Sequence, residues 1–310
     1  MTTSLATSSP VPSKPSTPAP QSGPAVEPPS VSLPKFAAAH KVPPSVQQVE
    51  FPIKDGDEYG GFASGLLHLP ADGQMPSKTA AILLSGAGGG VTGPSAMYVE
   101  LAAKLPALEA RIPVLRVSYR FPARTRPCVN DTRAAIRFLK QEHGVERFVL
   151  VGWSFGAAPA FFVAGQDERV VGVAGLAPQT ADALDGAREA GRRSCRLLLL
   201  HGTGDKTLDP RCSESLYAAW WSKRPPGSEV EADKEELAEL ILYDHDDHAL
   251  TRNAAKAEAE VFRFIAQCAE AEVQRSERKF VEAELVEGRE QRTQLMEEGG
   301  DLRGGREHIE

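Results

Sequence analysis

The stretch that decides the fold is FVLVGWSFGA, residues 148–157, where a short apolar run meets the pentapeptide GWSFG of residues 152–156. The apolar run predicts a strand, the pentapeptide a sharp turn, and the small residues after it a helix. Ser154 stands at the apex of that turn, where its hydroxyl projects out of the sheet and glycines are needed on either side. A chain of this length produces Gly-x-Ser-x-Gly by chance about once in ten, so the pattern needs support from the rest of the sequence.

Single strands and helices alternate along the chain on both sides of this stretch. Apolar strand patterns lie at 79–84, 112–119, 148–151, 169–176, 196–201 and 239–243, and helical patterns at 95–108, 130–142, 155–164, 181–190, 210–221 and 251–269. Two earlier strand patterns, 49–53 and 63–69, read as an antiparallel pair. The alternation predicts an α/β fold, a mostly parallel, doubly wound sheet of about eight strands with helices on both faces. The connection from 178 to 195 is too short to form a cap domain.

Composition divides the chain into three regions. Residues 1–45 are rich in Pro, Ser, Thr and Ala and predict a disordered tail. An organelle transit peptide is the alternative for this tail, although its many prolines and its lack of arginine count against that. Residues 46–270 form the predicted domain. Residues 271–310 are about half charged and predict a tail that is either a solvated helix, with Phe280, Val281 and Leu285 as its apolar patch, or disordered.

Several function classes are disfavoured by charge and composition. The net charge is −7 and no basic run is present, which argues against a nucleic-acid partner. No run of about 18 apolar residues occurs, so no membrane span is predicted, and the amino terminus lacks a secretory signal pattern. Four scattered cysteines without metal-ligand spacing predict reduced thiols, no metal site and a cytoplasmic location. The oligomeric state is not predicted.

Three side chains with complementary chemistry follow three of the predicted strands. A serine hydroxyl is a weak nucleophile near neutral pH, so it needs a base, an acid to orient that base, and amides that hold an oxyanion. Ser154 follows the strand at 148–151, Asp205 follows that at 196–201, and His248 follows that at 239–243. Because such groups gather at the carboxyl ends of parallel strands, we expect these three to meet.

On these motifs the sequence resembles the α/β-hydrolase superfamily, most closely its small, lid-poor dienelactone hydrolase-like members. The resemblance covers about 46–269 and rests on the segments GAGG (86–89), LRVSYR (115–120), GWSFG (152–156), HGTGD (201–205) and DHAL (247–250). It implies that Ser154 is the nucleophile, that His248 is the general base and then acid, and that Asp205 fixes the imidazole tautomer. It also implies an oxyanion hole made by the backbone amides of Ala87 and Phe155.

Other residues near these strand ends are candidates for contact with substrate. Gly88, Trp153 and Gln179 are predicted to line the substrate pocket. One departure from the family is Ser85-Gly86, where many relatives carry His-Gly before the oxyanion residue. Because the hole uses backbone amides, we expect catalysis to survive this change.

Each assignment has a competitor in the sequence. His245 lies nearer the strand end than His248, although the sequence DHAL before the last helix favours His248. Asp209 could replace Asp205, but it precedes Pro210 at a predicted helix start, where an N-cap role accounts for it. Asp182 or Asp185 could supply the acid in a variant arrangement, and His201 more simply braces its turn.

The sequence therefore predicts a serine hydrolase that cleaves a small-molecule carboxylic ester or thioester through an acyl-serine intermediate, with no cofactor and no metal. An amide hydrolase or an acyltransferase would use the same residues. The alternative from another class is a catalytically idle interaction module with this fold. One scaffold carries many chemistries, so the substrate itself does not follow.

Overall fold

The computed structural model describes residues 36, 41–54, 57–75, 77–223 and 237–302. Of the tail predicted at 1–45, residues 1–35 and 37–40 lie outside this range, as do residues 224–236 and the last eight residues. Among the described residues eight strands form one sheet: β1 (Ser45–Pro52), β2 (Phe62–Leu69), β3 (Thr79–Leu84), β4 (Val114–Ser118), β5 (Arg147–Trp153), β6 (Val170–Leu176), β7 (Arg196–Gly202) and β8 (Ala238–Tyr243).

The strand order in this sheet is β1-β2-β4-β3-β5-β6-β7-β8. β2 runs antiparallel to both of its neighbours, and every other pair is parallel. The prediction of a mostly parallel, doubly wound sheet is confirmed. Between β6 and β7 the chain forms one short helix and no cap domain, also as predicted.

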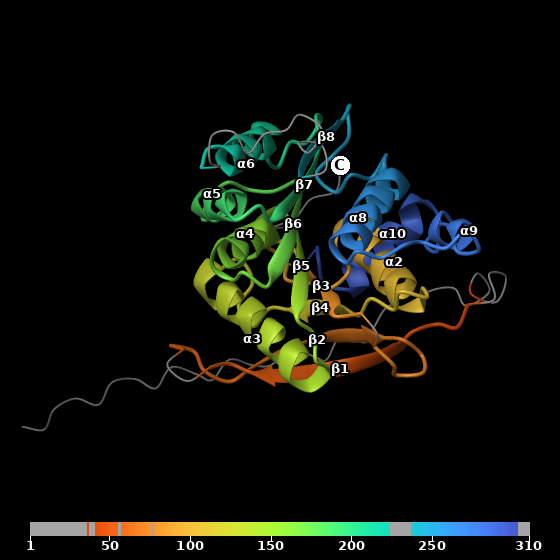
Figure 1. Ribbon diagram of the computed structural model, residues 1–310. Coiled ribbons are helices and arrows are strands. Elements are labelled where there is room, and N and C mark those ends of the chain that lie inside the picture. The colour runs from red at the N-terminus through yellow and green to blue at the C-terminus, as the bar shows by residue number, and fades with distance from the viewer. Residues whose placement is uncertain (1–35, 37–40, 55–56, 76, 224–236, 303–310) are drawn as a thin grey trace, which may run out of the picture.

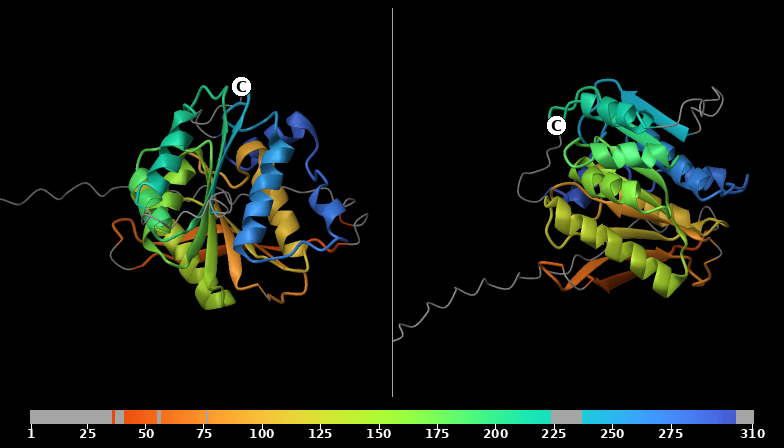
Figure 2. Two further views of the ribbon diagram at one scale, coloured as in Figure 1. Left: turned by 45° about the horizontal axis from the view of Figure 1, so that its top comes forward. Right: turned by 60° about the vertical axis from the view of Figure 1, so that its left-hand side comes forward.

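Helices cover both faces of the sheet (Figure 1). One layer holds α3 (Thr125–His143), α4 (Ala157–Gln166), α5 (Leu184–Arg192) and α6 (Arg211–Trp221). The other holds α2 (Met97–Lys104), α8 (Ala254–Cys268), α9 (Arg278–Val281) and α10 (Gly288–Glu298). Figure 2 shows the sheet between these two layers. Each face of the sheet has its own apolar core, because alternate strand residues point to opposite faces.

Several helices begin at residues that differ from the prediction, and for α3 and α8 the difference has a local cause. α3 begins at Thr125 instead of residue 130, since Pro127 falls in its first turn, where the missing amide hydrogen costs nothing. α8 begins at Ala254 instead of residue 251, because the carboxylate of Asp246 accepts the amides of Arg252 and Asn253 at 2.9 and 3.0 Å. The acid thus holds the preceding residues in a turn outside the helix.

The segment after residue 270 packs beside α2 and α8 and contributes to the core (Figures 1 and 2). Its buried apolar side chains are Phe280, Leu285, Val286, Leu295 and Met296. The ring centroid of Phe280 lies 5.3 Å from that of Phe36. The predicted apolar patch is therefore part of a larger contact between this segment and the domain.

A buried ionic cluster fixes that segment to the domain. Lys104 on α2 contacts Glu100 at 3.1 Å and Glu258 on α8 at 2.9 Å. Arg292 on α10 donates to the same Glu100 at 2.8 Å and to the carbonyl oxygen of Ser95, also at 2.8 Å. Because all four charged side chains are buried, each depends on its partners for charge compensation.

Candidate active site

Ser154 sits at the strained turn between β5 and α4. Its φ is 53°, a left-handed value that a non-glycine residue adopts only when its surroundings hold it there. A Cβ at position 152 would lie 2.4 Å from the carbonyl oxygen of Gly156, and a Cβ at position 156 would lie 2.3 Å from that of Leu84. Glycine is therefore required on both sides of Ser154, which the sequence pattern indicated.

His248 and Asp205 meet across the ends of β7 and β8. The Nδ1 of His248 lies 2.7 Å from Oδ2 of Asp205, and both side chains have no solvent exposure. The indole Nε1 of Trp153, next to Ser154, donates to the carbonyl oxygen of His248 at 3.1 Å. The two rings lie 5.6 Å apart between centroids. The turn that carries Ser154 thus holds the loop that carries His248.

The carboxylate of Asp205 accepts hydrogen bonds on both oxygens. Oδ1 accepts the amides of Thr207 and Leu208 at 2.7 and 2.9 Å, and Oδ2 accepts from His248 and from His201, the latter at 3.1 Å. Burial alone would raise the pKa of Asp205, but the bonds from the two histidines and the charge of His248 lower it well below its usual range. Asp205 is therefore ionised at neutral pH.

An ionised Asp205 settles which nitrogen of His248 carries the proton. Since a carboxylate only accepts hydrogen bonds, Nδ1 of His248 must donate, which leaves Nε2 free of a proton in the neutral ring. His201 is fixed by the same reasoning, because its Nε2 faces both Asp205 and the carbonyl oxygen of Leu208 at 3.1 Å. Its Nδ1 lies 2.7 Å from the hydroxyl of Ser213. His201 thus contacts the same oxygen of Asp205, Oδ2, as His248 does.

The competing residues lie elsewhere. The side chain of His245 is 80% exposed and its Nε2 lies 3.4 Å from Asp244, so it points away from Asp205. Asp209 accepts the amide of Arg211, the first residue of α6, at 2.9 Å, whereas the N-cap position of this helix is held by Pro210. Asp182 accepts from the hydroxyl of Thr125, and Asp185 pairs with Arg188. These contacts leave Asp205 as the acid next to His248.

Two acids that the sequence analysis did not single out as site residues shape the loop around His248. Asp246 accepts four hydrogen bonds from residues 247, 252 and 253, while Oδ1 of Asp247 accepts the amides of Ala249 and Thr251 at 3.0 Å. The run DHDDH drew attention to its histidines, whereas its two central acids are the residues that order the backbone. An acidic residue a few positions before a helix start is the sequence signal that could have identified them.

The glycine loop after β3, residues 85–93, lies against the turn at Ser154. β3 and β5 are neighbours, and Leu84 pairs with Gly152 in the sheet. The ring of Phe155 meets that of Tyr119 edge-on, with centroids 6.2 Å apart. The residues predicted for the oxyanion hole, Ala87 and Phe155, therefore follow the ends of two adjacent strands.

The residues predicted to line the substrate pocket are placed differently. Trp153 is fully buried beneath His248, where it supports the loop and is out of solvent contact. A Cβ at position 88 would lie 1.9 Å from the carbonyl oxygen of Asp301, so Gly88 packs on the C-terminal segment. Gln179 is half-buried, and its backbone amide donates to the carbonyl oxygen of Ser154 at 3.3 Å. Only Gln179 is placed to contact a bound molecule from solvent.

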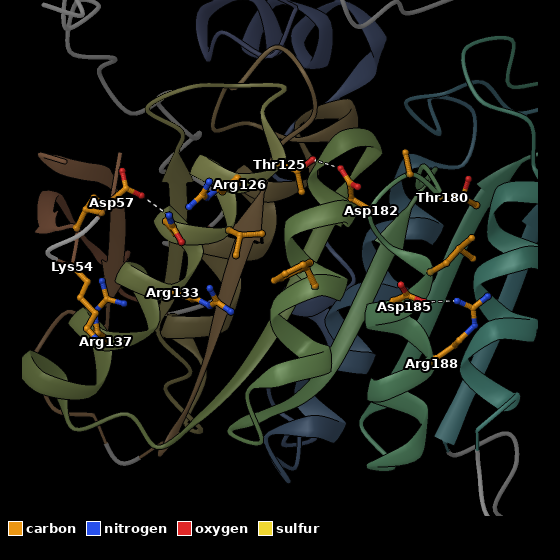
Figure 3. Close-up of a pocket in the computed structure, with 16 residues that line it drawn as sticks. Lys54, Asp57, Thr125, Arg126, Arg133, Arg137, Thr180, Asp182, Asp185 and Arg188 are labelled. Atoms are coloured by element: carbon orange, nitrogen blue, oxygen red, sulfur yellow. Dashed lines mark hydrogen bonds and ion pairs between the residues drawn. The ribbon is translucent and has the colours of Figure 1, made fainter. Parts of the chain in front are cut away.

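A cleft of about 1220 Å³ lies beside Gln179, over α4 and between α3 and α5 (Figure 3). Phe162 and Val129 are among its apolar lining residues, and Thr180 lines it next to Gln179. Its charged lining residues are Lys54, Asp57, Arg126, Arg133, Arg137, Asp182, Asp185 and Arg188. Burial and the like charges of Arg133 and Arg169 lower the pKa of Arg137. Five of the charged lining residues are cations and three are carboxylates, so the cleft has a small excess of positive charge on a chain whose net charge is −7.

The described residues contain neither a metal-binding cluster nor a membrane-spanning helix. Within the ranges given above, no group of three or more His, Cys, Asp or Glu side chains is arranged to hold a metal ion. In the same part of the chain, no helix has both the length and the apolar character needed to cross a bilayer. The four cysteines are free thiols.

Comparison with known proteins supports the fold. No family model matches the chain, and no curated protein matches it in sequence. Among solved structures, the chain is similar to a Pyrococcus furiosus esterase with a TM-score of 0.55 and 14% identity, over 75% of this chain and 93% of that one. It is similar to a lid-less a/b serine hydrolase of Xanthomonas campestris with a TM-score of 0.51 and 16% identity, over 72% and 94%.

A puromycin hydrolase is a further structural neighbour. Its TM-score is 0.54 at 17% identity, and the match covers 74% of this chain and 40% of that one. The strand order, the turn at Ser154 and these neighbours agree. The chain has the α/β-hydrolase fold.

Proposed function

We propose that the protein is a serine hydrolase that cleaves a carboxylic ester or thioester through an acyl intermediate on Ser154. The observation that carries this proposal is the buried contact between Asp205 and His248, held against the turn of Ser154 by the indole of Trp153. Three groups of the right chemistry, from the ends of three strands, converge on one edge of the sheet. Such convergence is what nucleophilic acyl transfer requires.

The proposed reaction follows from the protonation states at the site. The unprotonated Nε2 of His248 takes the proton of Ser154 Oγ as that oxygen bonds to the acyl carbon of the substrate. His248 then gives the proton to the departing alcohol or thiol as its bond to the acyl carbon breaks. Asp205 stabilises the imidazolium that exists between these steps. A water molecule activated by His248 completes the cycle, releasing the acid and restoring the hydroxyl of Ser154. These steps call for no metal or organic cofactor.

The backbone amides of Phe155 and Ala87 are the proposed donors to the oxyanion. An amide directly after the nucleophile and one from the loop after β3 are the usual pair in this fold. Preorganised donors of this kind contribute about 3–4 kcal/mol to the barrier reduction. The contact of Gly156 with the end of β3 supports this assignment, since it brings the two loops to one place.

The structural neighbours support a hydrolase in general terms. Two that resemble this chain are named as an esterase and a serine hydrolase, at identities of 14% and 16%. The choice of an ester or thioester over an amide, and of hydrolysis over transfer to an alcohol, rests on the triad chemistry alone.

Ester hydrolysis by the purified protein tests the proposal. The panel contains p-nitrophenyl esters of increasing chain length, the matching thioesters, and neutral and carboxylate-bearing acyl groups of equal length. Ser154→Ala is the blank, and we expect it to abolish turnover and labelling by a fluorophosphonate. Ser215→Ala is the matched control, because that serine is exposed on α6. Turnover by Ser154→Ala equal to that of wild type would exclude Ser154 as the nucleophile. Folded wild-type protein that neither turns over nor takes the label would indicate the idle interaction module instead.

A further inference from the structure

The C-terminal segment forms the wall behind the glycine loop at 85–93. The carbonyl oxygen of Gly299 accepts the amide of Val91 at 3.2 Å, and that of Leu295 accepts the hydroxyl of Thr92 at 3.1 Å. These contacts join residues about 200 positions apart in the sequence. The loop that carries Ala87 therefore depends on the last described turn of the chain for its position.

Asp301 makes the central contact of this wall. Its side chain is buried, Oδ2 accepts the amide of Thr92 at 2.7 Å, and Oδ1 accepts the amide of Gly93 at 3.1 Å. Both oxygens are thus used by consecutive backbone amides. An amide side chain could accept only one of them, because its nitrogen is a donor.

The backbone of Asp301 touches the loop nearer to Ala87. A Cβ at position 88 would lie 1.9 Å from the carbonyl oxygen of Asp301, and one at position 90 would lie 2.3 Å from its nitrogen. The two glycines are therefore needed for close approach of the two backbones. Gly88 is the residue directly after Ala87, so a shift of Asp301 moves the proposed oxyanion donor.

Arg116 holds the same loop from the sheet. Its guanidinium is fully buried, donates to the carbonyl oxygen of Val91 at 3.1 Å and donates to Nε2 of His68, also at 3.1 Å. Burial lowers the pKa of Arg116 to about 10, while the charge of Asp301 opposes this. Burial also keeps His68 neutral by lowering its pKa, with Arg116 adding to the effect. The loop thus lies between a buried cation and a buried carboxylate.

We propose that Asp301 is a positioning residue for the reaction, and that the C-terminal segment 295–301 sets the place of the Ala87 amide in the oxyanion hole. This inference rests on the proposed function, because it assigns a role within the same site. Asp301 does not touch the reacting atoms. It acts through the backbone of residues 88–93, which is contacted by both the side chain and the main chain of Asp301.

Two variants test this role from different sides. Asp301→Asn removes one acceptor, and Gly299→Ala places a Cβ 1.7 Å from the hydroxyl of Thr92, so it displaces the segment while Asp301 stays intact. We expect both to lower kcat about tenfold, with KM changed less than about twofold, since a misplaced oxyanion donor costs the transition state and not substrate binding. Glu297→Gln is the matched control, an exposed carboxylate on α10 that should leave kcat unchanged.

Hydrogen exchange of the peptide 85–93 measures the same positioning without any turnover. Both variants should raise its exchange at least about threefold, while peptides of α4 and β5 stay protected and the label still reaches Ser154. Wild-type protein without esterase activity would overturn the proposed function, and the exchange result would still decide whether Asp301 orders the loop. Wild-type kcat and wild-type exchange in both folded variants would overturn the role of Asp301. Loss of label together with general loss of protection would also contradict it, because that outcome marks a purely structural residue.

Discussion

The two halves of the proposed site are held in different ways. On the histidine side, Asp205, His248 and their supports come from segments directly after β7 and β8 and from Trp153 before the turn. On the oxyanion side, the glycine loop is held by residues 295–301, at the far end of the chain. The histidine side is completed by the fold itself, whereas the oxyanion side needs an added segment.

This difference indicates that substitutions in the segment that holds the glycine loop can change the geometry of the site while the reacting groups stay the same. The glycine loop of residues 85–93 has few side chains with which to fix itself, and glycine gives the backbone more freedom than any other residue. Segment 295–301 therefore supplies the hydrogen-bond acceptors that hold the loop amides, which the side chains of the loop do not provide. Changes on the histidine side should affect the chemical step directly, and changes on the oxyanion side should affect it through position.

The largest expected effect comes from the histidine side. Asp205→Asn should lower kcat by about 10⁴, because an amide nitrogen facing Nδ1 favours the wrong tautomer of His248. The rate of p-nitrophenyl acetate hydrolysis measures the loss. Asp209→Asn removes a carboxylate four residues away that accepts the amide of Arg211, and it should keep kcat within about twofold. Near-normal activity in Asp205→Asn would mean that another acid orients the histidine.

The residues proposed for the histidine side have local signals in the sequence. Ser154, Asp205 and His248 each follow a recognisable strand, and the parallel order brings strand ends together. It could not predict the role of Trp153, since an aromatic residue beside a nucleophile fits a substrate contact as well as a buried support. That choice depends on what covers the ring, which is a property of the packed chain.

The oxyanion side could be predicted only in part. The glycine run and Ala87 were found from the motif, but nothing in the sequence near Asp301 connects it with residues 88–93. The segment after residue 270 read as a charged tail because its apolar residues are few and widely spaced. Its burial comes from long-range contacts, and Arg292 and Asp301 are buried charges whose compensation lies on other elements.

The next largest effect concerns the attachment of that segment. Lys104→Met leaves the buried carboxylates of Glu100 and Glu258 without their shared cation, which should lower the free energy of unfolding by about 3–5 kcal/mol. Chemical denaturation measures this loss. Lys256→Met, at an exposed position of α8, is the control and should change it by less than about 0.5 kcal/mol. Equal stability of the two variants would mean that the ionic cluster does not anchor the segment.

The titration of Asp301 should make the free energy of unfolding depend on pH, which separates its effect on stability from its effect on the position of the loop. Burial raises the pKa of Asp301 to about 6, although the amides of Thr92 and Gly93 oppose the shift. The native state therefore holds this proton more tightly than the unfolded chain, where an aspartate titrates near 3.9. As pH rises from about 4 to 6, this group lowers the free energy of unfolding by about 2 kcal/mol, and the loss persists above pH 6.

Asp301→Asn has no carboxyl group to titrate, so its stability relative to wild type should rise by about 2 kcal/mol between pH 4.5 and pH 7. Denaturation curves at several pH values measure the difference, in which the contribution of Asp205 cancels. Glu297→Gln should show a difference that does not change with pH. The variant would then lose activity while it gains relative stability at neutral pH. A constant difference for Asp301→Asn would contradict the buried titration.

The smallest effect is expected at Thr92, whose hydroxyl contacts the C-terminal segment without involving the carboxylate of Asp301. Thr92→Val removes the hydrogen bond from the hydroxyl to the carbonyl oxygen of Leu295, an oxygen that also accepts the amide of Gly299 at 2.8 Å. Because that carbonyl keeps a partner, the loss of stability should be about 1 kcal/mol or less. We expect kcat to fall less than about threefold, and Thr92→Ser, which retains the hydroxyl, to match wild type. The two backbone amides bound by the carboxylate of Asp301 are intact in Thr92→Val. A tenfold loss of kcat in this variant would therefore mean that residues 295–301 position the loop together, and not Asp301 alone.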